Sequence, residues 1–269
     1  MVKNSTLKRF LGPKETEVIA RLTYEKLSVV TVEQFDRLFG FDTGLRKQLF
    51  FRLKRKRILV PITRGVYFFS PLESGPSGRR MNEYLVPPVL FPRGNYYVGY
   101  STLYNHYGFT DQLFQVMYIL NTSRQRKRVI GGIEFKLTLV SPKRMYGLEK
   151  IKIGDSEIIV SDRERTLVDL IYFSDPVGGL KQAFEILKSQ IRSKKADAKK
   201  LVKYALRFPG ISTRKRIGYT LDQAGVSAAS LRPLLKSVAK SSLRPLYGSK
   251  SRKGAIDQKW KLIIDDTRG

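Results

Sequence analysis

The sequence of 269 residues contains no cysteine and a single histidine, His106. The absence of thiols excludes disulfides, cysteine-ligated zinc sites and thiol nucleophiles. A single imidazole excludes metal sites built from several histidines, and no nucleophile or metal partner lies at a recognisable spacing from His106. Any chemistry in this chain must therefore rely on carboxylates, lysine, serine or tyrosine.

Long apolar runs are also missing. No stretch of about 18 consecutive apolar residues occurs, and the N-terminal MVKNSTLKRF leads into no apolar segment of the kind found in signal peptides. We therefore expect a cytoplasmic protein that has no membrane partner.

Acidic residues are scarce relative to basic ones. The chain has 51 Lys and Arg against 23 Asp and Glu, which gives a formal net charge of +28. A surface with so strong a positive potential attracts polyanions, and nucleic acid is the expected partner. The hydrophobic share of 42% is that of a folded protein, and the length fits one large domain or two ordinary ones.

Two short helices are predicted near the N-terminus. The first covers residues 14–27 and follows Pro13, which suits the start of a helix. The second follows Thr31, whose side chain is placed to form a capping box with Gln34, and it ends at Gly40. Both carry apolar residues on one face, as helices that cover a core do.

A third helix and a hairpin complete the first domain. The helix is predicted to follow a cap at Asp42 or Thr43 and to bury leucines spaced four residues apart. After it, ILVPITRGVYFF contains two β-rich runs around Gly65, which indicates a hairpin. Three helices followed by a hairpin are the layout of a winged helix-turn-helix, whose third helix enters the major groove of DNA. We therefore predict an α+β chain whose residues 1–70 form a winged helix-turn-helix DNA-binding domain.

The segment from Leu45 to Ser70 contains eight Lys and Arg residues and no acid. A helical wheel places polar side chains of the third helix opposite or beside its leucine stripe, where they can reach base edges. The predicted base-reading residues are Thr43, Arg46, Lys47 and Gln48. The predicted phosphate-binding residues are Lys54, Arg55, Lys56, Arg57 and, on the hairpin, Arg64. The alternative is that this run is a solvated cationic surface.

A stretch rich in Ser, Pro and Gly, SPLESGPSGRR, predicts a linker over residues 71–94, followed by an α+β domain at 95–269. This larger domain is predicted to contain a small sheet of roughly four or five strands and then several helices. Two basic clusters in it are candidates for further phosphate contacts. One is a hairpin tip with Arg124, Arg126, Lys127 and Arg128. The other is a row at four-residue spacing along the last predicted helix, namely Arg232, Lys236, Lys240 and Arg244.

The one catalytic alternative uses three carboxylates in VSDRERTLVDLIYF. Asp162, Glu164 and Asp169 are of the type that holds magnesium ions in nucleotidyl transfer. The competing interpretation is that Ser161 and Glu164 form a capping box at the start of a helix. No glycine-serine loop that could hold a triphosphate precedes these residues, so we expect no enzymatic activity, no metal and no cofactor.

Five segments in this order resemble the AbiEi family, the antitoxin and repressor components of type IV toxin-antitoxin systems. They span nearly the whole chain and are ITRGVYFF, YYVGYSTLYNHYGF, VSDRERTLVDLIYF, TRKRIGYTLDQAG and KWKLIIDD. The resemblance implies a transcriptional repressor that binds inverted repeats in promoter DNA through its winged helix. It also implies a C-terminal domain that counteracts a nucleotidyltransferase-like toxin without forming a stable complex, and it identifies no catalytic residue.

The alternative function is a general RNA-binding or ribosome-associated protein. The positive charge is spread over the whole chain, and there are 14 tyrosines whose rings could stack on bases. However, the sequence has no recognisable RNP-type aromatic motif. This alternative predicts tighter binding to structured RNA than to duplex DNA.

Overall fold

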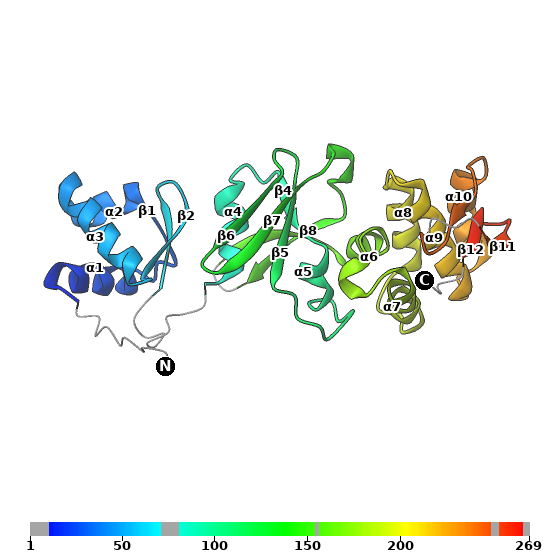
Figure 1. Cartoon of the computed structure of the whole chain (residues 1–269), viewed down its shortest axis with the longest axis horizontal. Helices are drawn as coiled ribbons and strands as arrows, with labels where there is room; N and C mark the ends of the chain where they lie inside the picture. The colour runs from blue at the N-terminus through cyan, green and yellow to red at the C-terminus, as the bar shows by residue number, and fades with distance from the viewer. Residues whose placement is uncertain (1–10, 71–80, 154–155, 249–252, 266–269) are drawn as a thin grey trace. The chain divides into compact units, whose positions relative to one another are not determined.

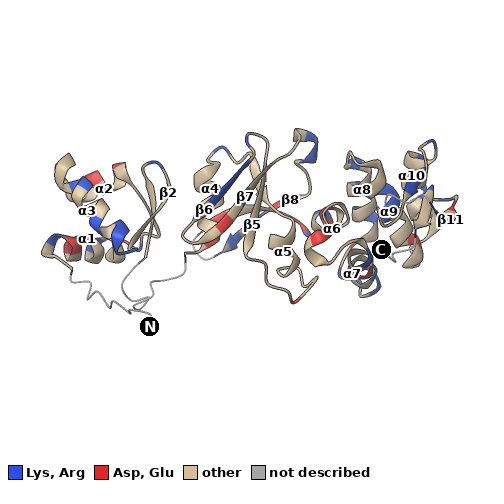
Figure 2. Ribbon diagram, viewed as in Figure 1, with Lys and Arg blue, Asp and Glu red and all other residues tan. Residues whose placement is uncertain are grey.

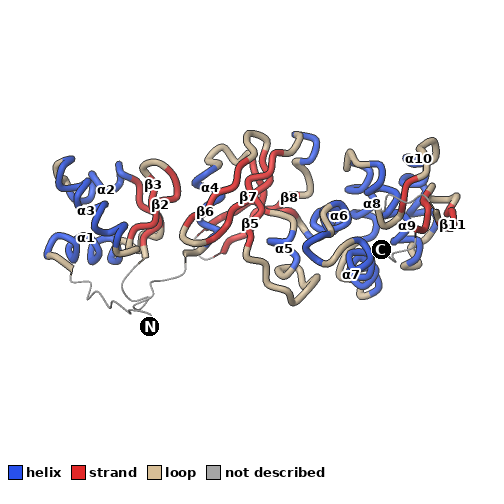
Figure 3. Tube along the Cα trace, viewed as in Figure 1, coloured by secondary structure: helices blue, strands red, loops and turns tan. Residues whose placement is uncertain are grey.

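The computed structural model of the chain describes residues 11–70, 81–153, 156–248 and 253–265. Figure 1 traces the chain, and its described residues form two compact units. The first contains the described residues up to Pro92 together with Val129–Ile133, and the second contains Arg93–Arg128 and the described residues from Glu134 onward. Helices and β-sheets are both present along the chain (Figure 3), in agreement with the predicted α+β class.

The first unit begins with three helices and a three-stranded sheet. Its elements are α1 (Pro13–Tyr24), β1 (Val29–Thr31), α2 (Val32–Phe39), α3 (Thr43–Arg55), β2 (Leu59–Thr63) and β3 (Val66–Phe69). The strands are antiparallel in the order β1-β3-β2, so the hairpin of β2 and β3 gains a third strand from the residues before α2. β1 was not predicted, because its three residues are too few to show a periodicity.

The local signals predicted for this unit are confirmed. Thr31 Oγ1 accepts a hydrogen bond from Gln34 N, and Gln34 Oε1 accepts one from Thr31 N, both at 3.1 Å. Gly40 ends α2 with a φ of 60°, and Gly65 turns the hairpin with a φ of 76°. Glycine adopts this left-handed region without strain. The apolar faces meet in one buried cluster that includes Val18, Leu22, Val30, Phe35, Leu49, Phe50, Leu53 and Phe69.

Part of the predicted linker over residues 71–94 is helical. Residues 71–80 lie outside the described residues, but η2 (Glu83–Leu85) and α4 (Val86–Leu90) fall within the range. Pro87 is at the start of α4, where the amide hydrogen that proline lacks would have no intrahelical acceptor. Val86 and Leu90 are buried, so this part of the predicted linker is packed into the folded structure.

A six-stranded mixed sheet has the order β6-β7-β5-β4-β9-β8. Its strands are β4 (Tyr96–Val98), β5 (Val116–Asn121), β6 (Arg126–Ile130), β7 (Ile133–Leu139), β8 (Leu148–Ile153) and β9 (Ser156–Ser161). β5 and β7 are parallel, as are β4 and β9, whereas β4 with β5 and β8 with β9 are antiparallel. The sheet is larger than predicted because the short strand β4 lies at its centre. Two short helical elements connect its strands, α5 (Ser101–Tyr104) and η3 (Pro142–Arg144).

Helices dominate the rest of the second unit. They are α6 (Arg163–Tyr172), η4 (Asp175–Val177), α7 (Leu180–Arg192), α8 (Ala198–Arg207), α9 (Ile211–Gln223) and α10 (Ala228–Val238). A small sheet of order β10-β12-β11 follows, from β10 (Arg244–Pro245), β11 (Gly254–Asp257) and β12 (Leu262–Asp265). Trp260 lies between β11 and β12 and is fully buried in the core that these helices share.

Candidate nucleic-acid interface

The exposed face of α3 brings together most of the predicted DNA-binding residues. Its exposed side chains are Thr43, Lys47, Gln48, Phe51, Arg52, Lys54 and Arg55. Leu49, Phe50 and Leu53 are buried on the opposite side of the helix. The helix contains no acid, so every charged side chain on its outer face is positive. Figure 2 shows the Lys and Arg positions of α3 in blue.

α3 begins at Thr43 because Asp42 caps it. Asp42 Oδ1 accepts hydrogen bonds from Gly44 N at 2.7 Å and from Leu45 N at 2.9 Å. We expect Asp42→Ala to lower the free energy of unfolding by about 1 kcal/mol, because the first-turn amides lose their acceptor. Asp42→Asn keeps a side-chain oxygen and is expected to recover most of that loss. Urea denaturation measures both variants, and equal losses would contradict the capping role.

The hairpin beside α3 presents Arg64. This residue is exposed in the turn between β2 and β3. The carbonyl of the next residue, Gly65, accepts a hydrogen bond from Val32 N at 2.9 Å. This bond joins the hairpin to the first turn of α2, so the position of Arg64 relative to the helices is fixed by the fold. Arg57, which follows α3, is exposed as well.

Two predicted DNA contacts are used inside the first unit instead. Arg46 forms an ion pair with Asp36 of α2, and its side chain is only 20% exposed. Lys56 forms an ion pair with Glu15 of α1, and its side chain is 19% exposed. Burial opposes ionisation of Glu15, but hydrogen bonds from Lys56 and from the backbone of Gly12 outweigh it and lower the pKa of Glu15. Both cations therefore stabilise the packing of the helices, and neither belongs to the exposed cationic face of α3.

Phe51 and Arg52 share the exposed face of α3, although neither is among the predicted DNA-binding residues. Phe51 is 57% exposed, although most large apolar side chains in this unit are buried. The helical wheel already places Phe51 away from the leucine stripe, but an apolar residue was not chosen as a DNA contact. An aromatic side chain among cations on an outer face is one that could contact a ligand.

The dipole of α3 explains only part of its positive charge. Arg52, Lys54 and Arg55 lie in the last turn, where the dipole favours cations. Lys47 lies near the middle of the helix and Arg64 lies in a different element, so the dipole accounts for neither. A binding role is therefore better supported for these two than for the cations of the last turn.

The first basic cluster of the second unit is not a hairpin tip, as the sequence analysis expected. Arg126, Lys127 and Arg128 belong to β6, which pairs with β7 at the edge of the sheet and does not neighbour β5. Arg124 lies in the loop before it and is exposed. Burial, together with the charges of Arg126 and Arg124, lowers the pKa of Arg128. Cations on an edge strand also prevent it from pairing with other chains, so the cluster has a structural explanation.

The row of cations predicted along the last helix is interrupted. α10 ends at Val238, so only Arg232 and Lys236 lie on it. Lys240 falls in the following turn, and Arg244 begins β10, where it pairs with β12. The cations keep their four-residue spacing beyond the end of α10. The chain there is not helical, because Arg244 lies in a strand that pairs with β12. All four side chains are exposed.

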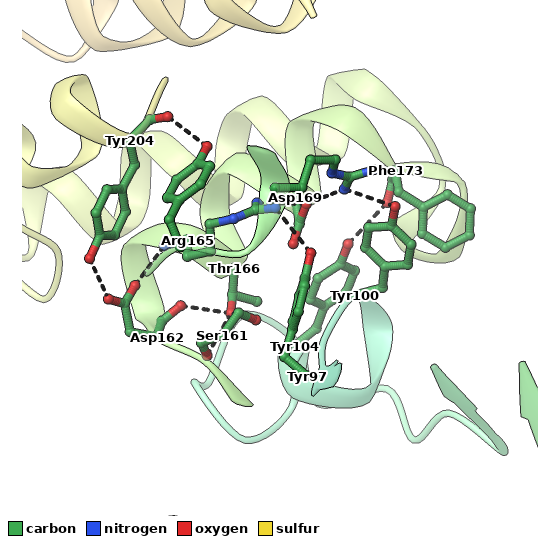
Figure 4. Close-up of polar contacts among 12 residues, drawn as sticks. Tyr97, Tyr100, Tyr104, Ser161, Asp162, Arg165, Thr166, Asp169, Phe173 and Tyr204 are labelled. Carbon is green, nitrogen blue, oxygen red and sulfur yellow. Dashed lines mark hydrogen bonds and ion pairs between the residues drawn. The ribbon is translucent and has the colours of Figure 1, made fainter. Parts of the chain in front are cut away.

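Each of the three carboxylates of the catalytic alternative is bound by partners within the fold, and Figure 4 shows two of them, Asp162 and Asp169. Asp162 caps α6, because its Oδ1 accepts a hydrogen bond from Arg165 N at 2.8 Å. Its Oδ2 accepts a second bond from Tyr204 of α8, also at 2.8 Å. Glu164 points to the start of α8, where it accepts a hydrogen bond from Asp197 N at 3.0 Å.

The predicted capping box of Ser161 with Glu164 is wrong, because the cap is the next residue, Asp162. Ser161 Oγ instead lies 2.8 Å from Thr166 Oγ1. Lys200 Nζ bridges the two carboxylates, at 3.1 Å from Asp162 Oδ2 and 2.8 Å from Glu164 Oε2. Burial disfavours the charged form of Lys200, but these two carboxylates outweigh it and raise its pKa.

The third carboxylate, Asp169, is buried between two guanidinium groups. Its Oδ1 lies 2.7 Å from Arg165 Nη1 and 2.9 Å from Arg144 Nη2. Arg165 also donates a hydrogen bond to Tyr97 OH at 3.1 Å, and Arg144 donates one to Tyr100 OH at 3.0 Å. Burial, reinforced by the charge of Asp169, raises the pKa of both tyrosines. Across the described segments no three His, Asp or Glu residues gather as a metal site.

Comparisons with known proteins show a fold but no family. No family model matches the chain, and no curated protein matches it. Among solved structures, the chain is similar to the RV2827C protein from Mycobacterium tuberculosis, with 15% sequence identity and a TM-score of 0.68. That match covers 95% of this chain and 92% of the other. At this identity the likeness supports the fold alone.

Among the described helices, none combines the length and the apolar character that a helix needs to cross a bilayer.

Proposed function

We propose that this protein is a sequence-specific DNA-binding repressor whose first unit is a winged helix-turn-helix. In this proposal α3 is the recognition helix and the hairpin of β2 and β3 is the wing. The observation that carries it is the exposed, acid-free face of α3 beside a hairpin whose turn presents Arg64. A helix of this kind fits the major groove of DNA, and an arginine on the adjacent hairpin can bind the phosphate backbone of the duplex.

The exposed residues divide into two roles. Thr43, Lys47 and Gln48 lie in the N-terminal half of α3, from which recognition helices reach base edges. Cations at the end of α3 and beyond it are suited to phosphates, which set affinity rather than sequence preference. These phosphate-binding residues are Lys54, Arg55, Arg57 and Arg64.

The proposal includes an antitoxin role for the larger part of the chain. Its support is the resemblance of five ordered sequence segments to the AbiEi family. The expected partners are inverted repeats in promoter DNA and a nucleotidyltransferase-like toxin that forms no stable complex with this protein. If a neighbouring gene encodes such a toxin, co-expression of this chain should restore growth, and continued growth arrest would contradict the antitoxin role.

Fluorescence anisotropy with duplexes from the region upstream of the gene tests the DNA-binding role. At 150 mM salt, we expect the upstream duplex to bind about 10³-fold or more tightly than a random duplex of equal length. A structured RNA of similar length is the third ligand in the assay. Equal binding to both duplexes would contradict sequence-specific repression, and tighter binding of the RNA would favour the RNA-binding alternative.

Two lysines of α3 are expected to differ in their effects. We expect Lys47→Ala to reduce the preference for upstream over random DNA by about tenfold, because a base contact is lost. We expect Lys54→Ala to weaken all duplexes similarly and to lower the slope of log K against log salt by about 0.9. Lys14→Ala is the control, since Lys14 is an exposed lysine of α1 whose Nζ lies 2.8 Å from Glu17. Identical effects of the two α3 variants on both duplexes would contradict the division of roles.

A further inference from the structure

Phe51 is an isolated apolar side chain on a cationic surface. It is 57% exposed, whereas the adjacent Phe50 is 6% exposed. The residues one helical turn before and after it are Lys47, Gln48, Lys54 and Arg55, and all four are exposed and polar. The guanidinium of Arg55 lies 5.7 Å from the centre of the Phe51 ring. The ring is therefore surrounded by polar side chains and carries a cation on one side.

The polar and cationic side chains around Phe51 restrict the kind of partner that could cover its ring. A protein partner would usually bury several neighbouring apolar side chains, and none adjoins Phe51 on this face of α3. The cations around the ring require a partner that is strongly negative. The partner must also offer a small apolar group at the centre of that negative surface.

The major groove of DNA meets both requirements, because thymine presents a C5 methyl group there, between two rows of phosphates. Resting on the proposed function, we infer that Phe51 contacts the C5 methyl of a thymine and is a specificity-determining residue of α3. Arg55 is held against the ring by a cation–π contact and reaches an adjacent phosphate. Phe51 therefore reads a base edge through apolar contact, while Lys47 and Gln48 read through hydrogen bonds.

The test replaces each thymine of the upstream duplex, one at a time, with deoxyuridine, which lacks only the methyl group. Binding is measured for the full-length wild-type protein and for Phe51→Ala. At one thymine, we expect deoxyuridine to weaken wild-type binding by about fourfold, the contribution of one buried methyl group. The same replacement should leave Phe51→Ala unaffected, because that variant has already lost the contact.

Tyr24→Ala is the matched control. Tyr24 is an exposed aromatic of α1, at 78%, and the guanidinium of Arg21 lies 5.9 Å from its ring. We expect this variant to bind like the wild type and to keep its sensitivity to deoxyuridine. Unchanged thermal unfolding of both variants would confirm that the fold is intact, as the exposure of both rings predicts.

Three results would overturn the inference. Phe51→Ala could bind as tightly as the wild type, could keep the same deoxyuridine sensitivity, or could alter the oligomeric state, which would place the ring against a second copy. If the wild type does not distinguish upstream from random DNA, the proposed function fails and the inference falls with it. If the wild type still distinguishes upstream from random DNA, but no deoxyuridine replacement is coupled to Phe51→Ala, then the inference fails and the proposed function stands.

Discussion

Asp169→Ala is expected to destabilise the protein by about 3–5 kcal/mol, because it leaves two guanidinium groups buried without a counter-charge. Asp169 Oδ1 lies within 2.9 Å of both Arg144 and Arg165, and Arg165 is fully buried. Tyrosine hydroxyls and aromatic rings surround the two cations, but none of these groups carries a negative charge at neutral pH. Urea denaturation followed by circular dichroism measures the loss.

An exposed ion pair provides the matched control for Asp169. Glu157 and Lys150 are 2.7 Å apart, and both side chains are more than 60% exposed. Glu157→Ala is therefore expected to change the free energy of unfolding by at most about 1 kcal/mol. Similar losses in Asp169→Ala and Glu157→Ala would contradict the view that buried charge compensation holds this region together.

Gly218→Ala is expected to destabilise the second unit by about 1–3 kcal/mol or more, because of overpacking. Gly218 lies inside α9, where alanine normally stabilises a helix by about 1 kcal/mol relative to glycine. Here a Cβ would meet the six-membered ring of Trp260, with Cε3 at 2.5 Å. Trp260 cannot withdraw freely, since it is fully buried and its Nε1 donates a hydrogen bond to Asp222 at 3.0 Å.

A double-mutant cycle isolates this clash. Trp260→Leu alone is expected to destabilise through the cavity that it leaves. In the double variant, however, the added methyl of Gly218→Ala occupies part of that cavity. The double variant should therefore lose less unfolding free energy than the sum of the losses in the two single variants. If the two losses of unfolding free energy were strictly additive, the cost of Gly218→Ala would not arise from a clash with the indole ring of Trp260. Trp260 is the only tryptophan, so its fluorescence reports the local repacking directly in Gly218→Ala.

The first unit could be predicted well because its signals are local. The capping box of Thr31, the left-handed turns at Gly40 and Gly65, and the cap at Asp42 each depend on residues a few positions apart. The exposed face of α3 followed from helical periodicity in the same way. The strand β1 has too few residues to show a period, and it exists because β3 pairs with it.

Long-range partners could not be predicted from the sequence. Arg46 was expected to read bases, but it pairs with Asp36 of the preceding helix. Lys56 pairs with Glu15, which lies 41 residues earlier in the chain. Nothing in the spacing of these residues indicates such contacts, because they form only when α1, α2 and α3 pack together.

The same limit applies to the second unit. Asp169 was one of three candidate metal ligands, and only the folded chain shows that Arg144, which lies 25 residues earlier, neutralises it. The end of α10 was misplaced because the cation spacing continues into β10, whose partner β12 lies far along the chain. Sequence periodicity therefore predicted most of the elements themselves, whereas the buried charges and the end of α10 depended on tertiary contacts.

The absence of cysteine allows the most direct test of the proposal that α3 lies in the major groove. A photo-crosslinker attached to a single cysteine in Gln48→Cys would stand on the exposed face of α3, and one in Tyr24→Cys would stand on α1. With upstream DNA bound at 150 mM salt, we predict crosslinks from position 48 to bases at one defined site in each repeat, and none from position 24. Bound DNA that crosslinks to position 24 and not to position 48 would contradict the account.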